Sequence, residues 1–434
     1  MAGPRVAFET LGCKLNQYET EAIAAGFLGL GWCVVDSREA AEAYVINTCT
    51  VTNKADRKSR NVFHRFLGLP FHPIVVVTGC FAESAKDRLE ATPGITFVVP
   101  NRAKNQIGAL VDAYHRGAVS SPRLPLPNPF GFPVPRRVFH TRATLKIQDG
   151  CDNFCSFCII PSVRGRAISR PWIEVLEEAR SLISQGRKEL VLSGVNMGRW
   201  TDGERNFAFL VRSLLNLEGD FRVRITSLEP DALGDDFLEL FDHPKMCPHL
   251  HLCLQSGSTR ILFAMGRQYT LDDYTALVHR LRSRRPSVNL TTDLIAGFPG
   301  ETPEDFEKTL EALRFLRWGD VHAFPFSPRK ETRAQRMPGQ IPDTTKAVRT
   351  ERLRQEAQTM RLEVMNGLIG ESRRVLVETP GIRTKATTLR GVTEDYFPVR
   401  FPGVAAWNEF VDVRLVRVES EGGQLFFQAS VVPV

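Results

Sequence analysis

Three cysteines lie within eight residues of one another in the run QDGCDNFCSFCIIP. Cys151, Cys155 and Cys158 have the spacing Cys-x3-Cys-x2-Cys, and we call them the second triad. Three thiolates at this spacing can bind three irons of one cubane cluster and leave the fourth iron without a protein ligand. An open metal position can bind a small molecule. Closed zinc sites need a fourth ligand, and the next cysteine is Cys247, so the spacing disfavours structural zinc.

Three further cysteines, which we call the first triad, are dispersed but share a local context. Cys13, Cys49 and Cys80 end the runs ETLGC, VINTC and VVTGC, each directly after a predicted strand. The carboxyl ends of parallel strands meet at one edge of an open sheet, so we expect the three thiols to converge on one cluster. The alternative is burial as a small apolar side chain. That interpretation suits the cysteines outside the triads, which are Cys33, Cys247 and Cys253.

The elements around the first triad follow a βαβ rhythm over residues 1–119. Short apolar runs predict strands at Arg5–Leu11, Ala43–Asn47 and Ile74–Thr78. Helical patterns lie between them at Tyr18–Leu30 and Lys54–Leu67. This alternation predicts an open, doubly wound parallel α/β sheet.

Residues 120–137 contain six prolines, which predicts a semi-rigid linker. Residues 138–366 then repeat the βα rhythm and predict a partial (βα)6 barrel that carries the second triad after its first strand. The six expected strands are Thr144–Gln148, Glu189–Ser193, Arg222–Thr226, His249–Leu252, Asn289–Ile295 and Val321–Phe326. Residues 367–434 are short, β-branched segments separated by Gly or Pro, which predicts a small all-β barrel.

Composition limits the class of protein. The 434 residues carry a net charge of +7, which is compatible with a polyanionic partner. No apolar run reaches the roughly 20 residues of a membrane span, and the N-terminus lacks a secretory pattern. Nine cysteines in such a chain favour metal ligation over disulfides, so we expect a cytoplasmic protein.

The second triad, with Phe157 before its last cysteine, resembles the signature of radical S-adenosylmethionine enzymes, whose six βα units form a partial barrel. The resemblance implies that S-adenosylmethionine binds the open iron. One electron then cleaves it to methionine and a 5′-deoxyadenosyl radical. The protein would position the reactants and exclude water.

Both triads together resemble the methylthiotransferase family over essentially the whole chain. The matching segments are TLGCKLNQYETE, INTCTVTNKAD, LKIQDGCDNFCSFCIIPSVRG, SLEP, HLHLCLQSGS, DLIAGFPGET and HAFPFSPR. The first two most resemble the branch that acts on N6-threonylcarbamoyladenosine next to the tRNA anticodon. Other branches carry different residues after the first cysteine. One departure is Cys253, where the family usually has proline.

The resemblance implies an enzyme that inserts a methylthio group at C2 of that adenosine, using two S-adenosylmethionine molecules and two 4Fe–4S clusters. The second triad would generate the radical, and the first triad would hold the cluster that carries or receives the sulfur. The implied partners are the anticodon stem-loop of tRNA, an electron donor such as flavodoxin or ferredoxin, and an unidentified sulfur donor, with no membrane.

Several polar residues stand at the expected carboxyl ends of barrel strands, where such barrels place their active sites. They are candidates for cofactor contacts, although each could instead cap a helix or complete a turn. Together with Phe157 these residues are Ser193, Gly194, Asn196, Glu229, Gln255 and Asp293.

RNA contacts are expected from two regions. The C-terminal segment resembles the TRAM module, whose aromatic residues Phe397, Phe401 and Trp407 either stack on bases or fill the core, burial being favoured for each. Arg57 and Lys58 lie in the basic run KADRKSRNVFHR beside the first triad and are expected to contact phosphates.

Other functions are compatible with these motifs. The same chemistry is possible on isopentenyladenosine in tRNA or on an aspartate of a ribosomal protein. An interpretation of another class is a non-catalytic RNA-binding protein with structural metal.

Overall fold

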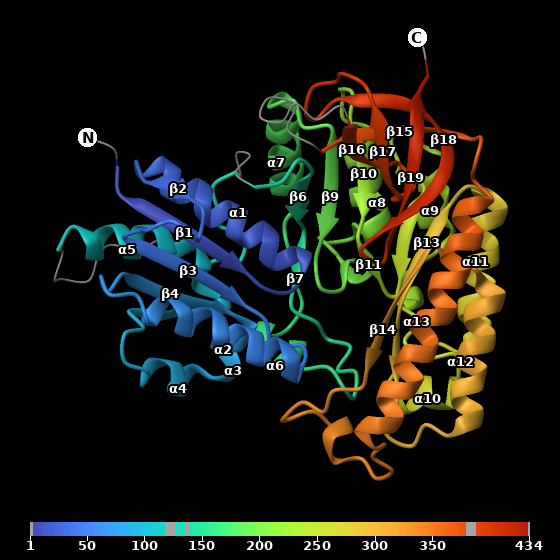
Figure 1. Cartoon of the computed structure of the whole chain (residues 1–434), viewed down its shortest axis with the longest axis horizontal. Coiled ribbons are helices and arrows are strands. Elements are labelled where there is room, and N and C mark those ends of the chain that lie inside the picture. The colour runs from blue at the N-terminus through green and yellow to red at the C-terminus, as the bar shows by residue number, and fades with distance from the viewer. Residues whose placement is uncertain (1–2, 118–126, 135–138, 379–387, 433–434) are drawn as a thin grey trace.

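The computed structural model describes residues 3–117, 127–134, 139–378 and 388–432 (Figure 1). Much of the expected linker 120–137 lies outside these residues. An N-terminal sheet with its helices lies beside a larger βα unit, and a C-terminal β-barrel lies against one end of that unit. No helix among the described residues has the length and apolar character needed to cross a bilayer.

The N-terminal unit is a five-stranded parallel sheet in the order β2-β1-β3-β4-β5. Its strands are β1 (Arg5–Thr10), β2 (Cys33–Val35), β3 (Ala43–Thr48), β4 (Ile74–Gly79) and β5 (Phe97–Val99). Helices α1 (Lys14–Gly29) and α5 (Ile107–His115) pack on one face. Helices α2 (Asn53–Leu67), α3 (Cys80–Ser84) and α4 (Lys86–Glu90) pack on the other, which confirms the doubly wound α/β fold.

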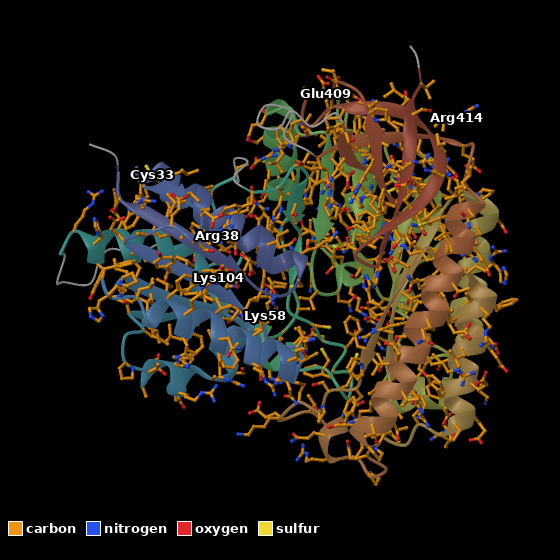
Figure 2. All side chains as sticks on the ribbon, in the orientation of Figure 1. Cys33, Arg38, Lys58, Lys104, Glu409 and Arg414 are labelled. Carbon is orange, nitrogen blue, oxygen red and sulfur yellow. The ribbon has the colours of Figure 1, made fainter. Side chains whose placement is uncertain are left out.

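Burial of Cys33, expected from the sequence, is wrong, because its side chain is exposed. The residue begins β2, a three-residue strand at the outer edge of the sheet. Figure 2 shows it at the periphery of the N-terminal unit. Cys247 and Cys253 are buried as expected.

The central βα unit contains two parallel sheets, in the orders β10-β9-β6 and β11-β12-β13-β14. Their strands are β6 (Ala143–Lys146), β9 (Glu189–Ser193), β10 (Arg222–Ile225), β11 (Ser227–Leu228), β12 (His249–Leu252), β13 (Asn289–Ala296) and β14 (Asp320–Pro325). A β-bridge joins Val223 of β10 to Met246, in the segment that leads into β12, and helices cover the outer face of the two sheets (Figure 1). These elements match the partial barrel expected from the sequence.

Side chains alternate along these strands between the helix-covered core and the concave face. Leu250, Leu252, Leu290 and Leu294 belong to the core that the outer helices cover. The covering helices include α7 (Trp172–Ser184), α8 (Phe207–Leu215), α11 (Leu271–Arg284) and α12 (Pro303–Leu316). Because successive side chains of a strand point to opposite faces, polar residues such as His251 and Asp293 point to the concave face.

Helix α13 (Asp343–Asn366) leads into the C-terminal barrel, which closes in the order β15-β16-β17-β19-β18. Its strands are β15 (Ser372–Val377), β16 (Thr388–Thr393), β17 (Pro398–Pro402), β18 (Phe410–Glu421) and β19 (Gln424–Val431). Phe397 and Phe401 are buried in its core, as favoured from the sequence. Trp407 is half-buried and donates to the Thr141 hydroxyl.

The C-terminal barrel is joined to the amino ends of the central strands by polar contacts. Arg222 donates to the carbonyl of Arg374 at 2.9 Å, and Arg224 donates to the carbonyl of Glu394 at 3.1 Å. Both guanidinium groups also pair with the buried carboxylate of Glu189. The two domains therefore share buried charges whose hydrogen bonds are satisfied only when they are docked.

Candidate iron–sulfur and cofactor site

The first triad lies at one edge of the N-terminal sheet. Cys13 follows β1 and caps α1, Cys49 follows β3, and Cys80 follows β4 as the first residue of α3. Strands β1, β3 and β4 are neighbours in the sheet, so their carboxyl ends are adjacent. The structure thus brings together the three cysteines that the sequence places at strand ends.

Two glycines allow the loops of this edge to approach closely. Gly12 has a φ of +100°, and a Cβ on it would lie 3.0 Å from the sulfur of Cys49. Gly79 has a φ of +97°, and a Cβ there would lie 2.3 Å from the carbonyl oxygen of Thr48. Both the backbone conformation and the close packing require glycine at these positions.

The cysteines of the two triads differ in exposure: Cys49 and Cys80 are buried, the second triad is partly buried, and Cys13 is exposed. Burial raises the pKa of Cys49 to about 11 and that of Cys158 to about 12. Burial also raises the pKa of Cys80, although Arg164 and Lys104 oppose this effect. Because metal ligands must be thiolates, binding here would release protons and would gain from the nearby cations.

The second triad lies in the loop between β7 (Gln148–Asp149) and α6 (Ile160–Arg164). The backbone N–H of Cys151 donates to the carbonyl of Gly165 at 3.1 Å, which folds the loop back on itself. Ile159 and Val163, just after this triad, pack against Cys80 of the first triad. The two cysteine sets therefore lie on contacting parts of the N-terminal and central units.

The loop after β9 carries three of the residues expected to contact a cofactor. Gln148 accepts hydrogen bonds from the backbone N–H groups of Val195 and Asn196, at 2.8 and 2.9 Å. A Cβ on Gly194 would lie 2.7 Å from Met197, and Ser193 is buried at the end of β9. The buried Asn196 side chain has no nitrogen or oxygen partner among the described residues, but it lies within hydrogen-bonding range of the Cys151 thiol. Burial raises the pKa of that thiol, and Asn196 opposes this larger effect. A buried amide with unused hydrogen-bonding capacity beside an iron–sulfur motif fits a polar ligand such as S-adenosylmethionine.

Glu229 and Phe157 meet at a third residue that sequence reasoning missed. Glu229, which follows β11, pairs with the guanidinium of Arg267. The same guanidinium lies 5.6 Å from the centre of the Phe157 ring. Burial is the main cause that raises the pKa of Cys155. Arg267 opposes this effect, and Glu229 adds to it. This charged pair therefore lies within electrostatic range of the second triad.

Asp293 lies on the concave face between two histidines that sequence reasoning also missed. Its Oδ1 is 3.4 Å from His251 Nε2 and 3.2 Å from His322 Nδ1. Burial raises the pKa of Asp293, but both histidines hold it well below its usual range. Gln255 has a φ of +71°, and its backbone pairs with Asp293 and Ile295. Of the residues expected to contact the cofactor, Gln255 thus contributes backbone hydrogen bonds next to Asp293.

Lys14, the residue after Cys13, reaches the C-terminal domain. Its ammonium donates to the hydroxyl of Tyr396 at 3.0 Å. The Tyr396 ring lies 4.5 Å from the ring of His249, which points to the concave face. In the sequence, the only signal for Lys14 is its position next to Cys13, a candidate cluster ligand. No sequence motif pointed to Tyr396.

Comparisons with known proteins match both cysteine-bearing units. The radical SAM superfamily matches residues 145–313, and a family described as uncharacterized protein family UPF0004 matches residues 5–100. The solved structure of the radical S-adenosylmethionine methyltransferase TsrM from Kitasatospora setae has the same fold, with a TM-score of 0.56 and 15% identity. It covers 89% of this chain and 77% of that chain.

Two curated relatives share most of the chain. The threonylcarbamoyladenosine tRNA methylthiotransferase MtaB of Bacillus subtilis (strain 168) is 36% identical over 412 residues, covering 92% of this chain and 90% of the relative. The tRNA-2-methylthio-N(6)-dimethylallyladenosine synthase of Cereibacter sphaeroides is 33% identical over 384 residues, covering 87% and 88%.

These similarities cover both cysteine-bearing units and most of the chain. Radical SAM enzymes use S-adenosylmethionine and a 4Fe–4S cluster, which agrees with the cofactors expected from the sequence. Identity above 30% over most of the chain is shared with relatives named as a tRNA methylthiotransferase and a tRNA-2-methylthio nucleoside synthase. The chain belongs to the radical S-adenosylmethionine methylthiotransferase family.

Proposed function

We propose that this enzyme modifies tRNA by inserting a methylthio group at C2 of N6-threonylcarbamoyladenosine next to the anticodon. Relatives at similar identity are named for two nucleosides, threonylcarbamoyladenosine and dimethylallyladenosine. The two nucleosides differ in the group on N6. The threonylcarbamoyl group ends in a carboxylate, whereas the dimethylallyl group is an uncharged hydrocarbon.

The position of Lys14 supports threonylcarbamoyladenosine over dimethylallyladenosine as the substrate nucleoside. The half-buried ammonium lies one residue from Cys13 and near the concave face of the central unit. Among the described residues no carboxylate lies within ion-pair distance of it. Burial lowers the pKa of Lys14, its hydrogen-bond partner Tyr396 opposes this effect, and Arg142 and Arg224 add to it. Three cations gathered around one ionisable phenol favour an anionic substituent over a hydrocarbon.

We assign one 4Fe–4S cluster to each triad. Cys151, Cys155 and Cys158 would hold the cluster whose open iron binds S-adenosylmethionine, and Cys13, Cys49 and Cys80 would hold the second. When bound, these cofactors supply radical formation and the sulfur that is inserted. The chain's own part is to hold the two loops together, exclude water from the thiols and orient the cofactor.

The residues nearest the second triad have separable tasks. Asn196, which lies beside Cys151, offers the unused hydrogen-bonding capacity of its buried amide to S-adenosylmethionine. Arg267 and Glu229 offer a paired charge beside Cys155. Phe157 packs against an apolar cluster that includes Met265 and Phe298. We propose Ser193, Gly194, Gln255 and Asp293 as further cofactor contacts. Two S-adenosylmethionine molecules are consumed, one for radical formation and one as methyl donor.

The partners follow from the substrate. We expect the anticodon stem-loop of tRNA as substrate, a flavodoxin or ferredoxin as electron donor, a separate sulfur donor and a cytoplasmic location.

Nucleoside analysis tests the proposal directly. A deletion strain should lose 2-methylthio-N6-threonylcarbamoyladenosine and retain its precursor, and the wild-type gene should restore it. Loss of the 2-methylthio-isopentenyl nucleoside instead would overturn the choice of substrate. Unchanged tRNA nucleosides, with an altered ribosomal protein, would assign the enzyme to the aspartate reaction.

The role of Lys14 is tested with purified enzyme. Lys14→Met should lower kcat/KM on threonylcarbamoyladenosine-containing tRNA by roughly 10- to 100-fold, the range expected for losing one charge-assisted hydrogen bond. Lys86→Met, an exposed lysine on α4, is the matched control and should have no effect. Anaerobic reconstitution should yield about eight irons per chain. Bound zinc without cleavage of S-adenosylmethionine would favour a non-catalytic RNA-binding protein.

A further inference from the structure

A buried cluster of charged side chains connects the loops of the two triads. Its members are Glu19, Lys104, Lys146, Asp149 and Arg164, and none has a side chain more than 6% exposed. We call it the charge hub. Figure 2 shows Lys104 inside the N-terminal unit.

Glu19 is the centre of the hub. Its carboxylate accepts from the ammonium of Lys104, from Lys146 at 2.9 Å and from Arg164 at 3.0 Å. Asp149 accepts from Lys146 at 2.7 Å and from Arg164 at 3.0 Å. Arg164, Lys104 and Lys146 hold the pKa of Glu19 well below its usual range despite the opposing effect of burial. The hub is thus an ionised network.

Every cation of the hub pairs with a carboxylate, but three cations and two carboxylates leave a net charge of +1. Buried charge that is not balanced is strongly unfavourable. The surplus lies next to the loops of the first triad, since Arg164 donates to Asn16, three residues after Cys13, and Lys104 donates to Asn47, two residues before Cys49, at 2.7 and 3.0 Å. An anion at the first triad would complete the charge balance.

Hydrogen bonds connect the hub to the loops of both triads. Arg164 lies six residues after Cys158, and Asp149 lies two residues before Cys151. Arg164 Nη2 donates to Asn16 Oδ1 at 2.7 Å. The amide nitrogen of Asn16 donates in turn to the carbonyls of Leu11 and Thr48, at 2.7 and 3.0 Å. These carbonyls lie next to the strand ends from which Cys13 and Cys49 project.

We propose that the charge hub is a positioning device that supplies one buried positive charge to an iron–sulfur cluster at the first triad and fixes the two triad loops to each other. The proposal rests on the proposed function, because it requires a cluster at the first triad. Three thiolates give such a cluster a net negative charge, which increases when the cluster takes up an electron. The surplus cation therefore favours the reduced state and raises the midpoint potential of that cluster.

The test uses the full chain with Cys151, Cys155 and Cys158 replaced by Ala, so that only the first triad can bind iron. In this background Arg164→Gln should shift the midpoint potential of the cluster to a more negative value, measured by redox titration with EPR detection. The expected size is at least about a tenfold smaller ratio of reduced to oxidised cluster at a fixed potential, which is about 59 mV for one electron. Arg164→Lys should keep most of the wild-type potential.

Opposite and matched variants separate this role from stability alone. Glu19→Gln removes a negative charge from the hub and should shift the potential in the positive direction. Lys104→Gln removes another positive charge of the hub and should also shift the potential in the negative direction. This variant provides the test if Arg164→Gln does not fold. Arg170→Gln removes a similarly buried arginine that pairs with Glu178 outside the hub, and it should lower thermal stability without changing the potential.

The outcomes distinguish the two proposals. Absence of about four irons in the triple-alanine background would overturn the assignment of a cluster to the first triad. Iron binding with the same potential in the wild-type, Arg164→Gln, Lys104→Gln and Glu19→Gln forms would overturn the role of the hub while leaving the cluster assignment intact.

Discussion

The ammonium of Lys14 and the hydroxyl of Tyr396 lie 3.0 Å apart, although 382 residues separate them in the sequence. Lys14 begins the helix after Cys13, and Tyr396 belongs to the turn between β16 and β17. The pair places a residue of the C-terminal domain directly beside the first triad. It also determines how Tyr396 ionises.

Tyr396 should ionise near neutral pH. Burial alone would raise its pKa, but Lys14 and Arg142 lower it to about 7. Carbon-13 NMR of labelled tyrosine should therefore show one of the six tyrosines titrating near pH 7. Tyr396→Phe should remove this titration, and Lys14→Met should move it toward the ordinary value of about 10.

The lowered pKa of Tyr396 determines how the free energy of unfolding depends on pH. The ionised phenol contributes stability that is fully present above the unfolded pKa of about 10 and is lost as the pH falls toward 7. Tyr396→Phe should remove this contribution to the free energy of unfolding. A titration in which no tyrosine ionises near pH 7 would contradict the arrangement.

His322 should lose its raised pKa when Asp293 is replaced. The hydrogen bond that His322 donates to Asp293 is the main cause of the increase, and burial opposes it. The protonated histidine stabilises the fold below its unfolded pKa of about 6.5, and this contribution is lost as the pH rises through the folded pKa. Asp293→Asn should lower the His322 pKa in a proton NMR titration. Asp242→Asn, which removes a surface pair with Arg284, should leave it unchanged.

Gly79→Ala should destabilise the N-terminal unit strongly. The left-handed backbone costs about 1–2 kcal/mol for any L-residue, and the contact with the Thr48 carbonyl adds about 1–3 kcal/mol. Gly186→Ala is the matched control, because it has a φ of +82° but no neighbour within 4 Å of the added Cβ. Chemical denaturation should show the larger loss for Gly79→Ala. Equal losses of stability in the two variants would mean that the loop at Thr48 moves to accept the added Cβ at no free-energy cost.

Reversing the charges of Arg57 and Lys58 should weaken tRNA binding. Both side chains are exposed on α2, and Lys58 lies toward the central unit (Figure 2). Each lost phosphate contact should reduce the slope of log affinity against log salt by roughly 0.7–0.9. Arg38→Glu is the control, since Arg38 is exposed but pairs with Asp36 in the loop after β2. A salt dependence equal to that of the wild type would exclude phosphate contacts at α2.

The strands that carry the first triad were predictable because they are buried on both faces. The expected strands at Arg5–Leu11, Ala43–Asn47 and Ile74–Thr78 agree with β1, β3 and β4 to within one residue. Strands β2 and β5 have three residues each and leave too short a pattern to detect. The burial expected for Cys33 was wrong for the same reason, because an edge strand leaves its first residue in water.

Contacts between distant residues were beyond sequence reasoning. Nothing near Glu19 in the sequence indicates that Lys104, Lys146 and Arg164 surround it, since the pairs form only when two domains dock. The histidines beside Asp293 come from two neighbouring strands, and only the strand register aligns them. Local pattern therefore located the cysteines, whereas tertiary packing determined their electrostatic surroundings.

The hydrogen bonds from Arg222 and Arg224 to carbonyls of the C-terminal barrel limit how this enzyme can be engineered. A chain shortened at Gly367 would leave two guanidinium groups with one carboxylate, Glu189, in a newly opened apolar surrounding. Such a truncated chain would tend to aggregate, and a foreign RNA-binding module grafted in place of residues 367–434 would have to reproduce those main-chain acceptors. The C-terminal barrel thus cannot be exchanged independently. Domain swaps between relatives should take the central strands and the C-terminal barrel from the same protein.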